Sequence, residues 1–259
     1  MPIAPLTATA AVVLRGFVAE RSLLAALVLV LSGFGAGVLV SDASLGPGAR
    51  FESNVAWVFA EVLGWSLALT HGAGVVGGRG VLGAFGLARP VSSGLLLAGR
   101  FLGLAAGLLL YVAVVGATLS AWLAVAHGSA TAAVPGIGWL LWLRLLVILA
   151  VSTLFLALVR PAVAIALAVL FSLAGWLAGS LPAAGPAYLQ PVTRLAALVL
   201  PDLSALDAPI AGIPGSLSEA APMLVGPTVY AILYAVAMVA AAIAVFPWWS
   251  RQPGARFLE

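Results

Sequence analysis

Six apolar stretches, each long enough to cross a bilayer as a helix, dominate this sequence. A helix needs about 20 consecutive apolar residues to span the hydrocarbon core, where unsatisfied backbone groups are costly. The stretches cover residues 22–40, 54–76, 95–125, 138–159, 162–181 and 224–246. We therefore predict an all-α integral membrane protein with six transmembrane helices, in a single transmembrane domain covering residues 1–259.

The composition agrees with a membrane location. Hydrophobic residues make up 64% of the 259 residues and charged residues only 7%, against about 25% charged residues in soluble domains. The net charge is +3, but the basic residues stand beside apolar stretches, as anchors to lipid headgroups do. We therefore expect the lipid bilayer as a partner and no nucleic acid.

The distribution of arginines predicts the orientation of the chain, because basic residues resist translocation. With both termini in the cytoplasm, only Arg50 and Arg194 lie outside, and Arg144 lies within a span. The cytoplasmic side then holds eight arginines: Arg15, Arg21, Arg79, Arg89, Arg100, Arg160, Arg251 and Arg256. We predict an N-in, C-in topology.

Three segments outside the spans have characters of their own. Residues 1–21 have apolar positions near helical spacing, which indicates a cytoplasmic interfacial helix or, alternatively, an early extension of the first span. Residues 77–94 form a cytoplasmic loop with basic residues and no acid. Residues 182–223 form an outer segment with seven prolines. Its apolar run 195–200 is too short to cross, so we predict a re-entrant or surface helix there.

Two ionisable residues fall inside the apolar stretches. Glu61 lies seven positions past Asn54 and Arg144 six past Gly138, which places both in the outer third, on the order of 10 Å below the outer boundary. They can form an ion pair between the second and fourth spans. Alternatively, Arg144 extends to water and Glu61 faces a wet crevice alone. The sequence does not decide between these two interpretations.

Other candidate sites are few. His71 and His127 fall at opposite ends of their spans, so we expect two solitary histidines at the headgroup level rather than a shared metal site. Without lysine there is no P-loop, and neither an HExxH motif nor a nucleophile elbow is present. We therefore predict no catalytic, metal-binding or cofactor-binding residue. A small-residue stripe in the third span predicts close helix packing at Gly99, Gly103 and Gly107.

The loop and the start of the third span resemble the ABC-2-type exporter permeases. That family places a glycine next to a charged residue after the second span, then a short helix, a small-basic-Pro-Val-Ser segment and a Gly-basic-Phe opening. The corresponding segments here are Arg79-Gly80, Ala88-Arg89-Pro90-Val91-Ser92 and Gly99-Arg100-Phe101. Six spans and a long outer segment before the last one match the same family. The family usually has an acidic residue and a threonine beside that first glycine, whereas this chain has Gly78-Arg79-Gly80-Val81.

The resemblance implies the transmembrane subunit of an ATP-driven exporter in a bacterial inner membrane. Such a subunit forms the substrate pathway and dimerises with a second copy or a close relative. A separate ATP-binding subunit holds ATP and Mg. Residues 81–87 would be the coupling helix on that subunit, and the implied coupling residues are Arg79, Gly80, Val81, Leu82, Phe85, Leu87, Arg89 and Pro90.

Two other interpretations remain open at this point. One is a membrane subunit that anchors a larger complex without transporting anything. The other is an ion-coupled secondary transporter with inverted repeats, suggested by the similar turns Leu87-Ala88-Arg89-Pro90 and Leu158-Val159-Arg160-Pro161.

Overall fold

The chain is helical wherever it forms regular structure in the described residues. A computed structural model describes residues 3–43, 48–77, 92–127, 133–178, 199–206 and 217–249, and these contain no strand. The α-helices are α1 (Ile3–Ala19), α2 (Arg21–Ala43), α3 (Gly48–Gly77), α5 (Ser93–His127), α6 (Ala133–Leu158), α7 (Pro161–Ala178) and α10 (Leu217–Trp249). A short 3₁₀ turn, η2, covers Ser204–Leu206. The predicted all-α class is confirmed for this part of the chain.

Four of these helices are long and apolar enough to cross a membrane. The spanning stretches lie in α2, α5, α6 and α10, at Arg21–Val40, Gly94–His127, Val134–Leu158 and Pro222–Val245. Two further predicted spans do not meet this standard. The apolar part of α7 is short, Pro161–Leu177, and α3 is 30 residues long but carries several polar residues. The chain is therefore a membrane-embedded helical protein, and the count of six spans stays a prediction.

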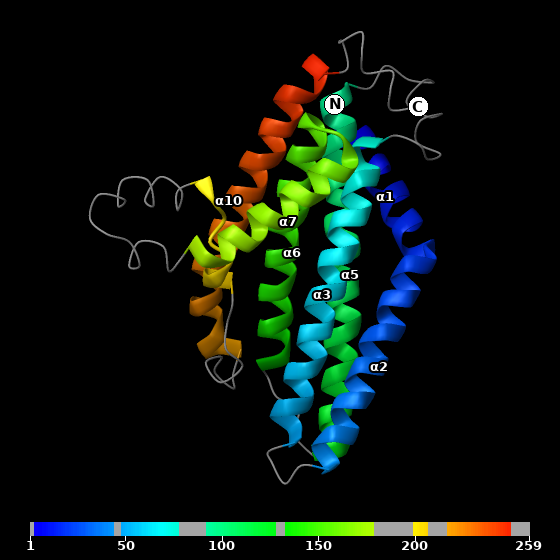
Figure 1. Cartoon of the computed structure of the whole chain (residues 1–259), viewed down its shortest axis with the longest axis vertical. Helices are drawn as coiled ribbons and strands as arrows, with labels where there is room; N and C mark the ends of the chain where they lie inside the picture. Colours follow the sequence, from blue (N-terminus) through cyan, green and yellow to red (C-terminus); the bar gives the residue numbers. More distant parts are fainter. Residues whose placement is uncertain are drawn as a thin grey trace, which may run out of the picture.

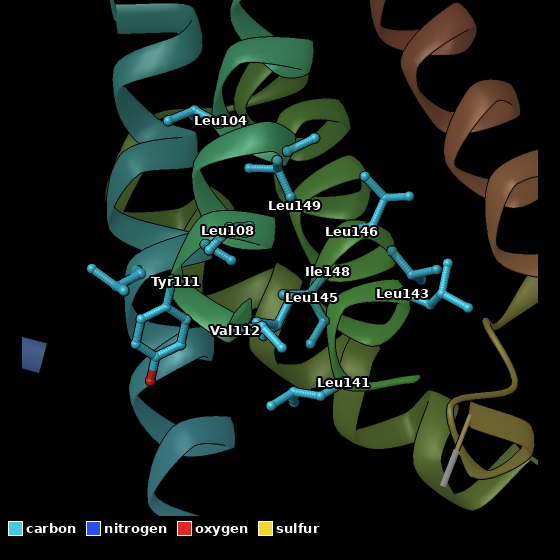
Figure 2. Close-up of a cluster of buried hydrophobic side chains, with 14 of the residues drawn as sticks. Leu104, Leu108, Tyr111, Val112, Leu141, Leu143, Leu145, Leu146, Ile148 and Leu149 are labelled. Carbon is cyan, nitrogen blue, oxygen red and sulfur yellow. The ribbon is translucent and has the colours of Figure 1, made fainter. Parts of the chain in front are cut away.

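Helix α6 lies at the centre of the bundle, in contact with α3, α5, α7 and α10 (Figure 1). Within its apolar stretch 83% of the residues are buried by other parts of the chain, against 22% in α10. Figure 2 shows leucine and isoleucine side chains of α6 among those of α5, including Leu108 and Tyr111. An apolar helix buried on all sides needs no amphipathic pattern, and α6 accordingly has apolar residues all around its circumference.

Three helices begin at least five residues earlier than the apolar stretches that predict them, and the first of these is α3, which begins at Gly48 rather than Asn54. Helix α6 begins at Ala133 rather than Gly138, with Pro135 in its first turn, where a missing N–H costs little. Helix α10 begins at Leu217 rather than Leu224, so seven residues assigned to the outer segment are helical. Backbone hydrogen bonding continues the helices past the point where apolar composition ends.

The predicted glycine stripe packs against the N-terminal helix. A Cβ on Gly103 would lie 2.6 Å from the Ala10 carbonyl oxygen, and one on Gly107 would lie 2.6 Å from the ring of Phe17. A Cβ on Gly99 would lie 2.8 Å from Thr9 Cβ. Helix α1 thus runs lengthwise along α5 at a distance that only glycine permits.

Candidate functional site

A buried charge network lies where α3, α6 and the segment 199–206 meet. Arg144 of α6 donates from Nη1 to Glu61 Oε1 of α3. The same guanidinium donates from Nη2 to the Leu206 carbonyl oxygen, at 3.1 Å. The structure therefore brings together the two ionisable residues picked out from the sequence, and adds a backbone acceptor from a distant part of the chain.

Burial makes this ion pair important for the fold. The Arg144 side chain is 5% exposed and that of Glu61 28% exposed, so the cation is almost fully removed from solvent. A buried guanidinium needs both a counter-charge and hydrogen-bond acceptors to offset its lost hydration. Glu61 provides the first and Leu206 contributes to the second. Arg144 therefore fixes α3 and residues 199–206 to the central helix.

The pair lies deeper along its helices than the sequence indicated. Helix α3 begins at Gly48 and α6 at Ala133, so Glu61 and Arg144 are 13 and 11 residues inside helices of 30 and 26 residues. Both are close to the middle of their helices. The expectation took the start of each apolar stretch as the start of the helix, whereas the helices begin six and five residues earlier. The depth of the pair in the membrane stays a prediction.

Two further polar clusters lie near the ends of α3, and each contains a histidine. The prediction that His71 and His127 are solitary was wrong, because each lies against a glutamate. At one end, Glu52 accepts from Trp122 Nε1 at 3.0 Å and lies 3.1 Å from His127 Nε2. At the other end, His71 pairs with Glu20, at the break between α1 and α2. The partners are 75 and 51 residues away in sequence, so no local pattern reveals them.

The spacing of these clusters matches the thickness of a bilayer. Glu61 lies nine residues after Glu52 and ten before His71 on one continuous helix. At ~1.5 Å per residue the two end clusters are about 28 Å apart, close to the hydrocarbon thickness of about 30 Å. Glu61 then lies near the midpoint between two polar layers.

The segment 199–206 is held by α10 as well as by Arg144. The Asp202 N–H donates to Tyr230 Oη at 2.6 Å, and Tyr234 Oη donates to the Val199 carbonyl oxygen at 2.8 Å. On the other side, the Leu203 N–H donates to the Gly175 carbonyl oxygen of α7, at 3.4 Å. Sequence reasoning missed both tyrosines, since a Tyr four residues from another in an apolar helix reads as ordinary core.

The predicted coupling residues 79–90 lie outside the described residues, and so does most of the outer segment. Of the motif that carries the family resemblance, Ser92 precedes α5, and Gly99, Arg100 and Phe101 lie within it. Gly99 contacts α1, as described above, and Phe101 is buried with 7% exposure. The structure thus places the start of the third span, whereas the loop itself stays a prediction.

The arrangement can hold α3, α6 and the segment 199–206 together. It consists of a buried ion pair, Glu61 with Arg144, whose guanidinium also holds the carbonyl of Leu206. Comparison of the chain with protein-family models, with curated proteins and with solved structures found no match.

Proposed function

We propose that this chain is the transmembrane subunit of an ATP-driven exporter of the ABC-2 type, in a bacterial inner membrane. It pairs with a second copy or a close relative and with a separate ATP-binding subunit. The observation that carries the proposal is the ordered set of segments around the loop, Arg79-Gly80, Arg89-Pro90-Val91-Ser92 and Gly99-Arg100-Phe101. Two helices joined by a basic loop can cross a membrane without these three segments in this order, so the order favours a specific family over a plain connecting loop.

The arrangement of the helix ends supports the proposal. Helix α3 ends and α5 begins at the same end of the bundle where α1 begins and α10 ends (Figure 1). A Cβ on Gly94 near the start of α5 would lie 2.7 Å from Ile243, near the end of α10. In our proposal this end faces the cytoplasm, which gives six spans with both termini inside. The loop between α3 and α5 then meets the ATP-binding subunit.

The buried ion pair gives this proposal a route for coupling. Helix α3 leads into the loop at one end and holds Arg144 through Glu61 near its middle. Arg144 in turn holds Leu206 of the outer segment. In our proposal, a displacement of the loop by the ATP-binding subunit moves α3 as a rigid rod and thereby moves residues 199–206. This would be a mechanical link from the cytoplasmic loop to the part of the outer segment that Arg144 holds.

The test is a charge placed on the proposed coupling helix. In Phe85→Asp, an apolar contact with the partner is replaced by a carboxylate, and truncating such an aromatic anchor costs ~2 kcal/mol or more of binding energy. We expect normal membrane insertion, loss of the copurifying ATP-binding chain and loss of transport. Ala184→Asp adds the same charge in the proposed outer segment and serves as the matched control. If Phe85→Asp retains the ATP-binding chain in full, the coupling role is wrong and a scaffold subunit becomes the better interpretation.

A further inference from the structure

Residues 199–206 form irregular backbone at the middle depth of the bundle. Their anchors are Arg144, close to the middle of α6, and Tyr230 and Tyr234, close to the middle of the 33-residue α10. Only Val199 at the start of this segment and the 3₁₀ turn at its end are helical. The segment lies beside α10 and the end of α7 (Figure 1). Along the axis of the bundle, the segment lies at the same height as Glu61, which is midway between the polar clusters at the two ends of α3.

One side of this segment is buried and the other is open. Leu203 and Leu206 are 0% and 1% exposed and point into the core. Ser204 and Ala205 are exposed, and Asp202 is partly exposed. The Asp202 carboxylate accepts from the Ser204 hydroxyl and from the Ala205 N–H through Oδ1. The open side therefore presents a carboxylate, a hydroxyl and the backbone of a single 3₁₀ turn.

Lipid cannot cover such a surface. Hydrocarbon offers no hydrogen bonds, so irregular backbone at membrane depth is found only against protein or in a water-filled cavity. A carboxylate facing lipid at mid-depth is costly, which is why carboxylates in membrane proteins face the protein interior or water. In the sequence, the chain on both sides of this segment is rich in proline and includes Gln190, Arg194 and Asp207.

We propose that residues 202–205 form the floor of an aqueous vestibule that reaches the middle of the membrane from the outer side. Its chemical character is anionic, set by the Asp202 carboxylate, so it attracts cationic groups of molecules that enter it. The vestibule depends on the fold and on the orientation of the chain, and it holds equally for an exporter or a scaffold subunit. Loss of the proposed ATP-binding partner would leave it unchanged.

The experiment uses the natural absence of cysteine in this chain. Ala205→Cys places a thiol on the open side without removing the bond between Ser204 and Asp202. A membrane-impermeant thiosulfonate reagent is applied to intact cells that express the full chain. We expect Ala205→Cys to be labelled from outside, because only an ionised thiol in water reacts.

The matched control is Ile232→Cys, at the same level of α10. Ile232 lies two residues from both Tyr230 and Tyr234, about 160–200° around the helix from each, and is 43% exposed. Lipid on that face keeps the thiol neutral and unreactive, so we expect no labelling. Labelling of Ala205→Cys only after denaturation, or equal labelling at both positions, would overturn the proposal. The first result means that protein covers the floor, and the second means that hydrocarbon does not surround the bundle.

The charge of the vestibule is tested by comparing two reagents. A cationic thiosulfonate should react with Ala205→Cys roughly three- to tenfold faster than an anionic one of similar size, relative to their rates with a free thiol in solution. Adding Asp202→Asn should reduce this preference to near unity while leaving the introduced thiol labelled, since asparagine keeps the shape and both acceptor contacts. A preference that survives Asp202→Asn would contradict the assignment of the charge to Asp202.

Discussion

Replacing Glu61 by glutamine removes the counter-charge of a buried arginine while keeping nearly the same side-chain volume. Arg144 is only 5% exposed and cannot reach bulk water without displacing the core around it. Breaking a buried pair by removing one partner costs about 3–5 kcal/mol in water-soluble proteins. Because Glu61 is 28% exposed, water screens part of the interaction, and we expect about 2–3 kcal/mol here.

The assay is thermal stability of the purified chain in mild detergent, measured as the fraction that stays monodisperse after heating. For a chain of this size each kcal/mol shifts the midpoint by about 2–4 °C, so Glu61→Gln should lower it by roughly 5–10 °C. Arg144→Lys should lower it too, because an ammonium lacks the planar fork that reaches both Glu61 and Leu206.

A charge swap tests whether the two residues interact directly. Glu61→Arg and Arg144→Glu should each reduce folded yield, and the double variant should recover part of it. Recovery is expected to be incomplete, because a glutamate at position 144 would face the Leu206 carbonyl oxygen instead of donating to it. Strictly additive losses in the double variant would refute the reasoning, since residues in contact must show a coupling energy.

Two further predictions concern packing and the end clusters. Gly103→Ala should lower stability by about 1–3 kcal/mol, because its Cβ would lie 2.6 Å from the Ala10 carbonyl oxygen, whereas Gly35→Ala, with open space around it, should be neutral or slightly stabilising in the same heating assay. Glu52→Ala should cost about 1–3 kcal/mol by leaving Trp122 and His127 without their acceptor, whereas Glu20→Ala, at a carboxylate whose side chain is 54% exposed, should cost under about 1 kcal/mol. Equal losses at the two glutamates would contradict the role assigned to burial.

The helical class and the membrane location could be predicted from the sequence because few backbone structures satisfy all their hydrogen bonds inside a bilayer. An apolar stretch of about 20 residues is either a span or a central helix, and in both cases it is helical. The same reasoning singled out Glu61 and Arg144, since a charge inside an apolar stretch requires either a partner or access to water. Composition could not give their depth, because the helices extend past the apolar stretches at Gly48 and Ala133.

What the sequence could not give are the contacts made across long separations. Glu52 meets His127 and Glu20 meets His71 only after the helices pack, and each histidine read alone resembles a solvated surface residue. Tyr230 is a similar case, because its hydroxyl is explained only by the backbone of Asp202, which lies 28 residues away. Which of these residues meet depends on how the helices pack, and a single sequence does not show it.

Helix α3 shows why low hydropathy is weak evidence against a membrane span. The residues that make it less apolar than α2 or α6 include Glu52, Glu61 and His71, and each of these contacts a different partner element. Glu52 contacts α5, Glu61 contacts α6, and His71 contacts the junction of α1 and α2. Each polar side chain is thus paired within the bundle, so the cost that hydropathy assigns to it in lipid does not apply. The distance of about 28 Å between the outermost two matches the hydrocarbon thickness, as expected if they lie at its two boundaries. For this helix, therefore, polarity and membrane insertion are compatible, and its low hydropathy is no argument against the second predicted span.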